Sequence, residues 1–310
     1  MKIKNKNSRH FSLTKTIWPI FRFILLLGLS YVIILPFLQK ISAMFMSPSD
    51  LQNPTVWMVP INPTLDNVIR VIKYGGYIPA FLNSLLISTV CAILQTFICC
   101  MVGYGFAKFK FKGKNIFFLL SILTIIIPPQ TLYLSLYMKF RYFDIFGILS
   151  LLGIGKVKLV ETALPSAILS ATGLGLKNGL YIFVMRQFFK GVPQELNEAA
   201  WVDGCNPIRA FFSTMLPLAK PMLISVFLLS FAWQWTDTFY SGLFNRSMTV
   251  LPMILNKVTA IATESISNGT MMSSVMQNTA VIMIIAPLFI FYIIFQRNLI
   301  QGIERSGIVG

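Results

Sequence analysis

Six long apolar runs constrain what this chain can fold into, because each is long enough to cross a lipid bilayer as a helix. About 18 or more apolar residues in a row are typical of a transmembrane helix. Only 12% of the 310 residues are charged, against about 25% in a soluble domain. We therefore predict an all-α integral membrane protein whose spans lie at residues 18–38, 81–106, 116–138, 162–189, 218–243 and 275–295.

The distribution of Lys and Arg predicts how these spans are oriented. The chain has 26 of these residues against 10 Asp and Glu, and in an apolar chain such an excess is typical of cytoplasmic loops rather than of nucleic-acid binding. The bases gather in the two terminal tails and in the loops after the second and fourth spans. We therefore expect both termini in the cytoplasm. The loop at 139–158 is the exception, since four bases lie there on the predicted outer side: Lys139, Arg141, Lys156 and Lys158.

The spans divide the chain into five segments. Residues 1–16 are predicted to form a basic cytoplasmic tail, 17–38 the first transmembrane helix, 39–80 an external loop, 81–297 a core of five helices, and 298–310 a cytoplasmic tail. The first span is expected to be an uncleaved anchor, because its apolar part exceeds the ~7–15 residues of a signal-peptide core. The external loop is rich in proline, and it either caps the helices or serves as a docking surface.

Candidate catalytic and metal-binding groups are scarce. The single histidine, His10, lies in the basic tail, and the four cysteines have neither disulfide nor zinc spacing. Gly155-Lys156 lacks the first glycine and the following Ser or Thr of a phosphate-binding loop. We therefore expect a protein that is not an enzyme and that binds no metal or cofactor itself.

The loop between the fourth and fifth spans, residues 192–217, carries the most specific local pattern. Glu195 and Glu198 favour the positive N-terminal end of a short helix. Gly204 can end that helix in a left-handed conformation, and Asn206 can cap a second helix. The pattern predicts two short helices that are bent at Gly204. They either lie on the lipid surface as an amphipathic turn or fit into a cytoplasmic partner.

This loop resembles the EAA motif of ABC-importer permeases, and in particular of carbohydrate permeases related to the inner subunit of maltose-type transporters. The similarity rests on Glu198-Ala199-Ala200, on Gly204 after three further residues, and on Leu216-Pro217 twelve residues later. Weaker similarities at 60–67, 103–108, 128–130 and 233–237 extend it over nearly the whole chain. Thr214 departs from the family, which usually has an aliphatic residue there, and we expect one apolar contact of the loop to be weaker.

The resemblance implies a multi-pass subunit of the bacterial plasma membrane that imports a sugar or oligosaccharide by alternating access. It implies that the chain forms half of a translocation pathway beside a second, different permease subunit. Two cytoplasmic ATPases would bind ATP and Mg, and an extracellular solute-binding protein would deliver the sugar. Membrane lipid would surround the spans, and no nucleic acid is involved. The residues implied to couple the chain to the ATPases are Glu195, Glu198, Ala199, Ala200, Asp203, Gly204, Leu216 and Pro217.

The resemblance also assigns a role to the end of the chain. Residues 302–310 resemble a family tail that reaches the ATPase interface, and the alternative is a frayed end.

Polar and aromatic residues inside the spans are the candidates for the pathway. Lys177 lies among glycines at membrane depth, which predicts an interrupted helix that lines a cavity; alternatively, its side chain snorkels to the interface. If Lys177 faces the pathway, the sugar could be acidic. Pro128 and Pro129 predict a kink in the third span. The predicted pathway residues are Gln130, Lys177, Asn178, Trp233, Trp235 and Asp237, of which the aromatic ones can equally form an interfacial belt.

A transporter that works alone is the alternative function. Such secondary transporters typically have an internal repeat and ionisable groups paired inside the membrane. Asp237 is the one acidic residue available within the predicted spans, so the sequence favours the ABC-importer interpretation.

Overall fold

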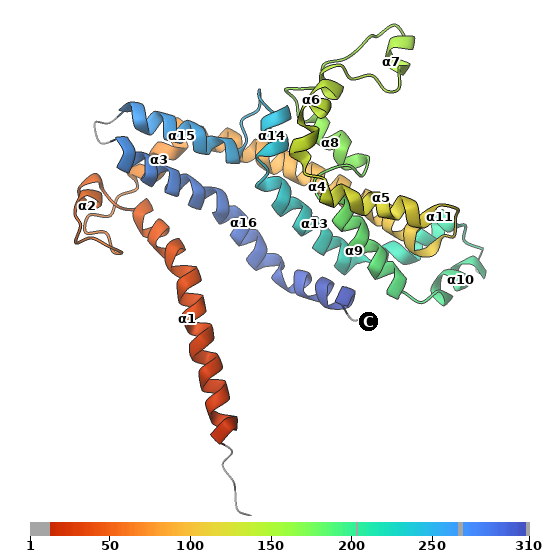
Figure 1. Cartoon of the computed structure of the whole chain (residues 1–310), viewed down its shortest axis with the longest axis horizontal. Helices are drawn as coiled ribbons and strands as arrows, with labels where there is room; N and C mark the ends of the chain where they lie inside the picture. Colours follow the sequence, from red (N-terminus) through yellow and green to blue (C-terminus); the bar gives the residue numbers. More distant parts are fainter. Residues whose placement is uncertain (1–12, 203, 266–268, 308–310) are drawn as a thin grey trace, which may run out of the picture.

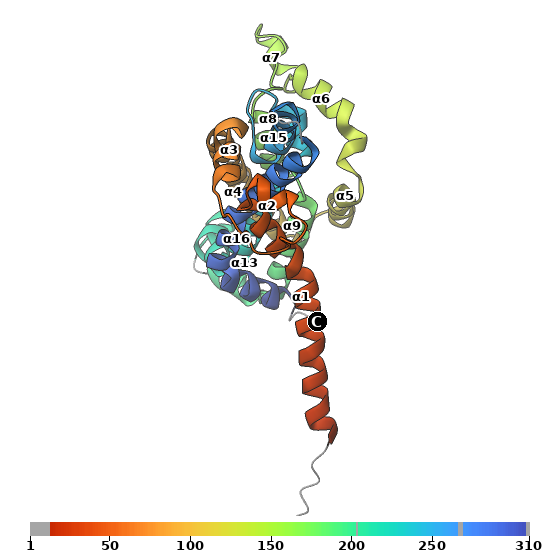
Figure 2. The same cartoon turned by 90° about the vertical axis from the view of Figure 1, so that its left-hand side faces the viewer.

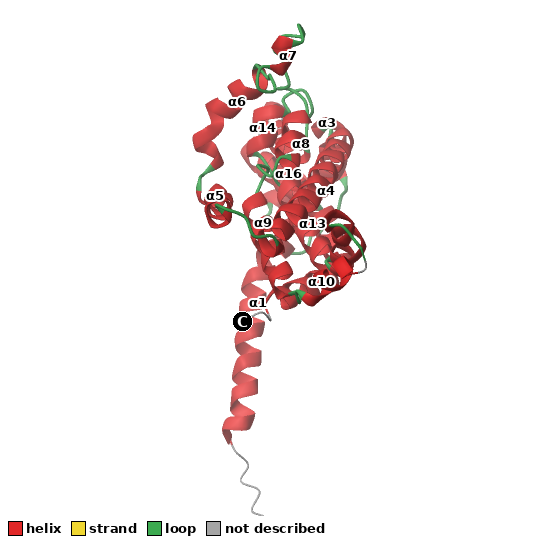
Figure 3. Ribbon diagram, turned by 90° about the vertical axis from the view of Figure 1, so that its right-hand side faces the viewer, coloured by secondary structure: helices red, strands yellow, loops and turns green. Residues whose placement is uncertain are grey.

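The computed structural model describes residues 13–202, 204–265 and 269–307. Helices and loops make up these ranges (Figure 3). One isolated antiparallel bridge, between Phe143 and Val157, is the only β-type pairing among the described residues. The prediction of an all-α chain is confirmed.

The five longest helices among the described residues each have 15 residues or more. They are α1 (Leu13–Met44), α4 (Tyr77–Lys108), α13 (Lys220–Trp235), α15 (Leu251–Ser265) and α16 (Gly269–Gly307). The shorter helices of the first two thirds of the chain are α2 (Pro48–Gln52), α3 (Asp66–Gly75), α5 (Lys114–Ile126), η1 (Pro129–Leu132), α6 (Tyr133–Arg141), α7 (Ile148–Leu151), α8 (Leu164–Ala171) and α9 (Asn178–Gly191). Those that follow are α10 (Glu195–Val202), α11 (Pro207–Ala210), the π-helical segment η2 (Phe211–Met215), α12 (Leu216–Leu218) and α14 (Phe239–Phe244).

Three of these helices are long and apolar enough to cross a membrane without interruption, over Trp18–Met44, Tyr77–Lys108 and Ser273–Leu299. Two further candidates are bent pairs of helices. Lys114–Ile126 and Pro129–Arg141 meet at 97°, and Pro207–Leu218 and Lys220–Trp235 meet at 77°. By length and composition, the described residues therefore hold three candidate spans, or five if each bent pair crosses once. The count of six spans and the side on which the termini lie stay predictions.

Two predicted interruptions are present in the fold. The third apolar run bends at Pro128, which has an extended backbone and, like Pro129, no amide hydrogen to continue the helix. The fourth run breaks between α8 and α9, where Gly173 and Lys177 have φ values of +76° and +63°. A right-handed helix cannot continue through left-handed residues, so the chain forms a loop at 172–177.

α4 is the central helix, and α8, α9 and α13 pack against it (Figure 1). The crossing with α9 depends on Gly103, because a Cβ atom there would lie 2.6 Å from the Cβ of Met185 and 2.9 Å from the amide nitrogen of Arg186. The largest buried cluster lies around this crossing and includes Cys99, Tyr104, Met185, Phe189 and Met215.

α1 extends away from the body, and its apolar side chains between residues 18 and 38 are exposed (Figures 1 and 2). The C-terminal end of α1 contacts α16, and there Lys40 Nζ donates a 2.5 Å hydrogen bond to Asn278 Oδ1. The segment predicted as a long external loop is partly helical, because α1 continues to Met44 and α3 packs on α15 and α16. At the other end α16 runs on to Gly307, and residues 308–310 lie outside the described residues.

Candidate functional sites

The 192–217 loop has the backbone that its sequence predicts. The amide groups of Asn197 and Glu198 donate to the carbonyl of Gln194 at 3.0 and 3.2 Å, which starts α10. Gly204 has a φ of +80° and turns the chain. The side chain of Asn206 then accepts a 2.7 Å hydrogen bond from the amide of Arg209, which caps α11. Two short helices bent at Gly204 are therefore present.

The loop is fixed to the end of α4 by polar and aromatic contacts. The hydroxyl of Tyr104 donates to Asn197 Oδ1 at 3.2 Å, and both side chains are buried. Lys108 Nζ donates to the carbonyl of Val192 at 2.5 Å. The ring of Tyr104 also lies 5.0 Å from that of Phe211, measured between centroids. These contacts join the loop to the C-terminal part of α4.

The outer surface of the loop combines acidic and apolar side chains. Glu195, Glu198 and Ala199 are exposed, whereas Ala200 is buried beneath them. Sequence reasoning missed two large apolar residues on this surface, Val202 and Ile208, which are 87% and 70% exposed. The sequence feature that could have indicated them is the presence of an apolar residue on each side of the bend at Gly204. At the far end of the loop Leu216 is half-buried and Pro217 exposed; Asp203 lies outside the described residues.

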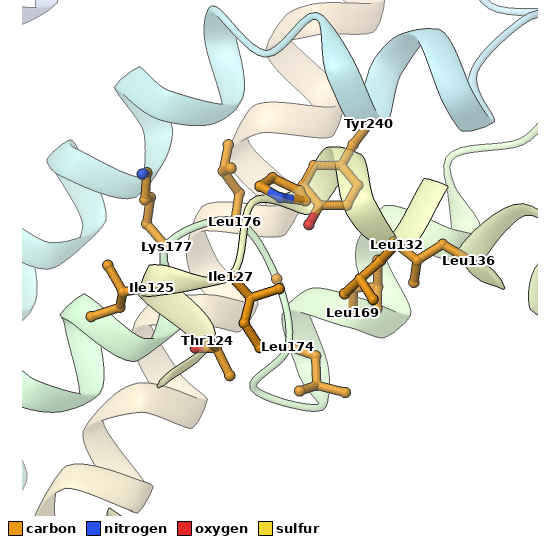
Figure 4. A pocket seen from close by; sticks show the side chains of 12 residues that line it. Thr124, Ile125, Ile127, Leu132, Leu136, Leu169, Leu174, Leu176, Lys177 and Tyr240 are labelled. Atoms are coloured by element: carbon orange, nitrogen blue, oxygen red, sulfur yellow. The ribbon is translucent and has the colours of Figure 1, made fainter. Parts of the chain in front are cut away.

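A cavity of about 190 Å³ lies where the two predicted interruptions meet (Figure 4). α5, η1 and α6 line one side of it, and the 172–177 loop lines another. Its walls are mostly aliphatic, and its polar side chains are those of Thr124, Lys177 and Tyr240. Lys177 and Tyr240 belong to different elements and lie on opposite sides of the cavity in this view.

A buried polar cluster, made of Gln95, Ser230 and the 172–177 loop, holds the backbone next to Lys177. Gln95 is 0% exposed. Its Nε2 donates to the carbonyl of Leu176 at 3.1 Å, and the hydroxyl of Ser230 donates to Oε1 of Gln95. A Cβ atom on Gly175 would lie 3.0 Å from the Cα of Ser170. Sequence reasoning missed Gln95, although an amide inside an apolar span was the available signal.

The structure separates the six predicted pathway residues. Lys177 lines the cavity, and its Nζ lies 4.9 Å from the ring centroid of Trp233, which is 47% exposed. Gln130 is exposed beside the lining residue Pro129 but does not line the cavity itself.

The other three lie within the packed helices. Asn178 is buried at the start of α9. Trp235 is buried and donates from Nε1 to the carbonyl of Ile284 at 3.0 Å. Asp237 accepts from the amides of Tyr240 and Ser241 at 3.3 and 2.8 Å, so it caps α14. Of the six predicted residues, Lys177 alone lines the cavity, and Trp233 contacts Lys177 without lining the cavity itself.

Residues 100–305 match the family described as "Binding-protein-dependent transport system inner membrane component". The chain is 29% identical to the arabinooligosaccharides transport system permease protein AraQ of Halalkalibacterium halodurans, over 94% of this chain and 98% of that protein. It is 25% identical to the trehalose transport system permease protein SugB of Mycobacterium tuberculosis, over 82% and 85%.

Its fold is similar to that of a chain in the crystal structure of a bacterial ABC transporter involved in the import of the acidic polysaccharide alginate. The TM-score is 0.70 at 19% identity, with 94% of this chain and 99% of that chain covered.

Proposed function

The chain belongs to the family of binding-protein-dependent transport system inner membrane components, and we propose that it is the permease subunit of an ATP-driven importer of a sugar or oligosaccharide. Membership in the family makes it a multi-pass membrane protein. The names of the similar permeases, which transport arabinooligosaccharides and trehalose, support a carbohydrate as the substrate.

The observation that carries the coupling role is the attachment of the 192–217 loop to α4. The loop presents exposed acidic and apolar side chains, and Tyr104 and Lys108 bond its backbone and side chains to the helix. In the proposed mechanism two cytoplasmic ATPases bind ATP and Mg and close on each other. The loop moves with them, and α4 transmits that movement to the cavity, which opens alternately to either side.

Individual residues of the loop take separate roles in this mechanism. The Glu198 carboxylate pairs with a basic group of an ATPase, and Glu195 and Asp203 add negative charge. Ala199 and Ala200 allow close approach, Gly204 sets the bend, and Leu216-Pro217 connects the loop to α13. The segment at 302–310 contributes to the same interface in this proposal.

The substrate passes between this chain and a second, different permease subunit after an extracellular solute-binding protein delivers it. Lys177 and Trp233 are the proposed contacts, because an ammonium group binds carboxylates and an indole ring stacks on sugar faces. An acidic sugar is the substrate that best fits the Lys177 ammonium group, which forms no ion pair among the described residues and lies beside the cavity. The chain shares its fold with a chain of a transporter that imports the acidic polysaccharide alginate.

We further propose six spans with both termini in the cytoplasm. The three uninterrupted spans and the two bent pairs supply five. The interrupted pair α8 and α9 supplies the sixth, since a broken helix at membrane depth is tolerated where it is buried in protein or lines a cavity.

Reconstitution in proteoliposomes tests the function. The chain is purified together with the second permease and the ATPase of the same transporter, and sugar uptake is measured with and without ATP and the solute-binding protein. Uptake that requires both is the expected result. Uptake that is driven by an ion gradient and is indifferent to ATP would instead establish a secondary transporter.

A further inference from the structure

Four cations converge at the end of the α5–α9 pair that adjoins the 192–217 loop. Lys110 precedes α5 and Lys114 begins it, while Arg186 and Lys190 lie on the last two turns of α9. Lys114 is close enough to the other three for their positive charges to act on it. We call these four residues the basic cluster. α5 and α9 pack side by side (Figures 1 and 3).

The basic cluster has no acidic partner among the described residues. Neither 107–119 nor 178–194 contains Asp or Glu, and none of the four cations forms an ion pair in the part of the chain that the structure describes. Glu195 acts on Lys108, which is not one of the four and which bonds to the carbonyl of Val192. Four like charges without a counterion repel one another, so an anion from outside the chain would stabilise them.

Arg186 is the fixed member of the basic cluster. Its guanidinium carbon lies 3.9 Å from the ring centroid of Phe118, and its Nε is buried without a hydrogen-bond partner in the described structure. Lys114 is held by a 2.9 Å hydrogen bond from Nζ to the carbonyl of Phe109. Lys110 and Lys190 are exposed and free to adjust to a ligand. A rigid guanidinium with two mobile ammonium groups beside it suits a phosphate group.

The position of the basic cluster indicates which kind of molecule would supply that phosphate group. α5 has no buried residue, and its exposed apolar side chains run from the cluster along the helix: Ile116, Phe117, Leu119, Leu120 and Leu123. Such a surface faces acyl chains in a bilayer, which places the charges at its end at the depth of the lipid headgroups.

We propose that the basic cluster is a binding site for the phosphate headgroup of an anionic phospholipid in the leaflet on the side of the 192–217 loop. Basic clusters of this size beside a transmembrane helix attract anionic lipids. The inference rests on the membrane location of α5 and not on the identity of the sugar or on the ATPase coupling.

Native mass spectrometry of the purified transporter complex tests the site. The complex is equilibrated with phosphatidylglycerol and phosphatidylcholine of equal chain length, and the retained lipids are counted. The test variant is Lys110→Gln, Lys114→Gln and Lys190→Gln together, which keeps Arg186 and changes no buried side chain. The matched control is Lys139→Gln, Arg141→Gln and Lys156→Gln, which removes the same charge from the 139–158 loop.

We expect the wild type and the control to retain phosphatidylglycerol preferentially and the test variant to lose the preference at least tenfold, since each cation contributes about fivefold at low salt. Equal retention by wild type and test variant would overturn the proposal, as would an equal loss in the control. Competition by millimolar inorganic phosphate without a preference for phosphatidylglycerol would assign the site to free phosphate instead.

A protein ligand would give a different pattern. If the test variant keeps its lipid but no longer co-purifies with the ATPase, the basic cluster is a protein interface and the lipid assignment is wrong. The uptake assay for the proposed function is a separate measurement, so either inference can fail without the other.

Discussion

Gly204 is the residue whose conformation most restricts substitution in the 192–217 loop. Its φ is +80°, and no atom lies within 4 Å of the position a Cβ atom would take. The restriction is therefore conformational and not steric, and a β-branched residue would cost about 1–2 kcal/mol in this left-handed region. We expect Gly204→Val to insert normally but to transport less sugar per ATP hydrolysed.

The matched control at this position is Gly204→Asn, because asparagine tolerates the left-handed region. It should retain most of the coupling, measured as the ratio of uptake to phosphate release in proteoliposomes. Normal coupling in Gly204→Val would show that the bend has no mechanical role.

Lys177 allows a second prediction at the same scale. If the substrate is acidic, Lys177→Met should raise the KM for uptake about tenfold by removing one charge contact, whereas Lys177→Arg should retain affinity. The Asn178→Ala variant is a neighbouring control that leaves the charge in place. Uptake of an acidic and a neutral oligosaccharide by each variant is the measurement, and an equal loss for both sugars would contradict an electrostatic role.

At the scale of elements, the α4–α9 crossing depends on Gly103. A Cβ atom there would overlap Met185 and the backbone of α9, so Gly103→Ala must separate the two helices and should cost about 1–3 kcal/mol. Gly105→Ala on the same helix is the control, since its Cβ atom would meet only the ring of Phe109 at 4.0 Å. Thermal denaturation in detergent should show a lower Tm for the first variant alone.

The hairpin that contains α7 gives a pH prediction. The Ser150 hydroxyl and the amide of Leu149 donate to the Asp144 carboxylate and hold its pKa below the usual value. A lowered pKa stabilises the fold above the unfolded-state pKa, about 4, and that stabilisation is lost as the pH falls through the folded value. Hydrogen exchange at Leu149 should therefore be protected from pH 8 down to about 5 in the wild type, after correction for intrinsic rates, and unprotected in Asp144→Ala.

Local sequence signals predicted the elements that are determined locally. Pro128 ended one helix and the glycines before Lys177 interrupted another, because backbone conformation is set by the residue itself. The extension of α1 to Met44, the helix α3 and the π-helical turn at Phe211–Met215 could not be read in this way. Each depends on what packs beside it, and the same is true of Gln95, whose partners lie 81 and 135 residues away in sequence.

At the scale of the whole molecule, orientation in the membrane is the main prediction. Lys112 lies in the loop after α4 and Lys156 in the 139–158 loop, and the proposed topology puts them on opposite sides. In a Cys205→Ser background, a membrane-impermeant maleimide should label Lys156→Cys in intact cells and Lys112→Cys only after permeabilisation. The reverse pattern would show that the topology is inverted. Labelling of both residues in intact cells would show that they lie on the same side, so that the chain does not cross the membrane an odd number of times between them.

α4 reaches both candidate sites within one unbroken helix. Gln95 supports the cavity and Lys108 bonds to the 192–217 loop, which places them about 20 Å apart at ~1.5 Å per residue. If this helix transmits the movement of the ATPases, thermodynamic linkage requires the effect to run in both directions. A sugar in the cavity would then change the affinity of the loop for its ATPase. The factor would be the same as that by which the ATPase changes the affinity of the cavity for the sugar, so binding of the substrate would itself regulate the ATPase.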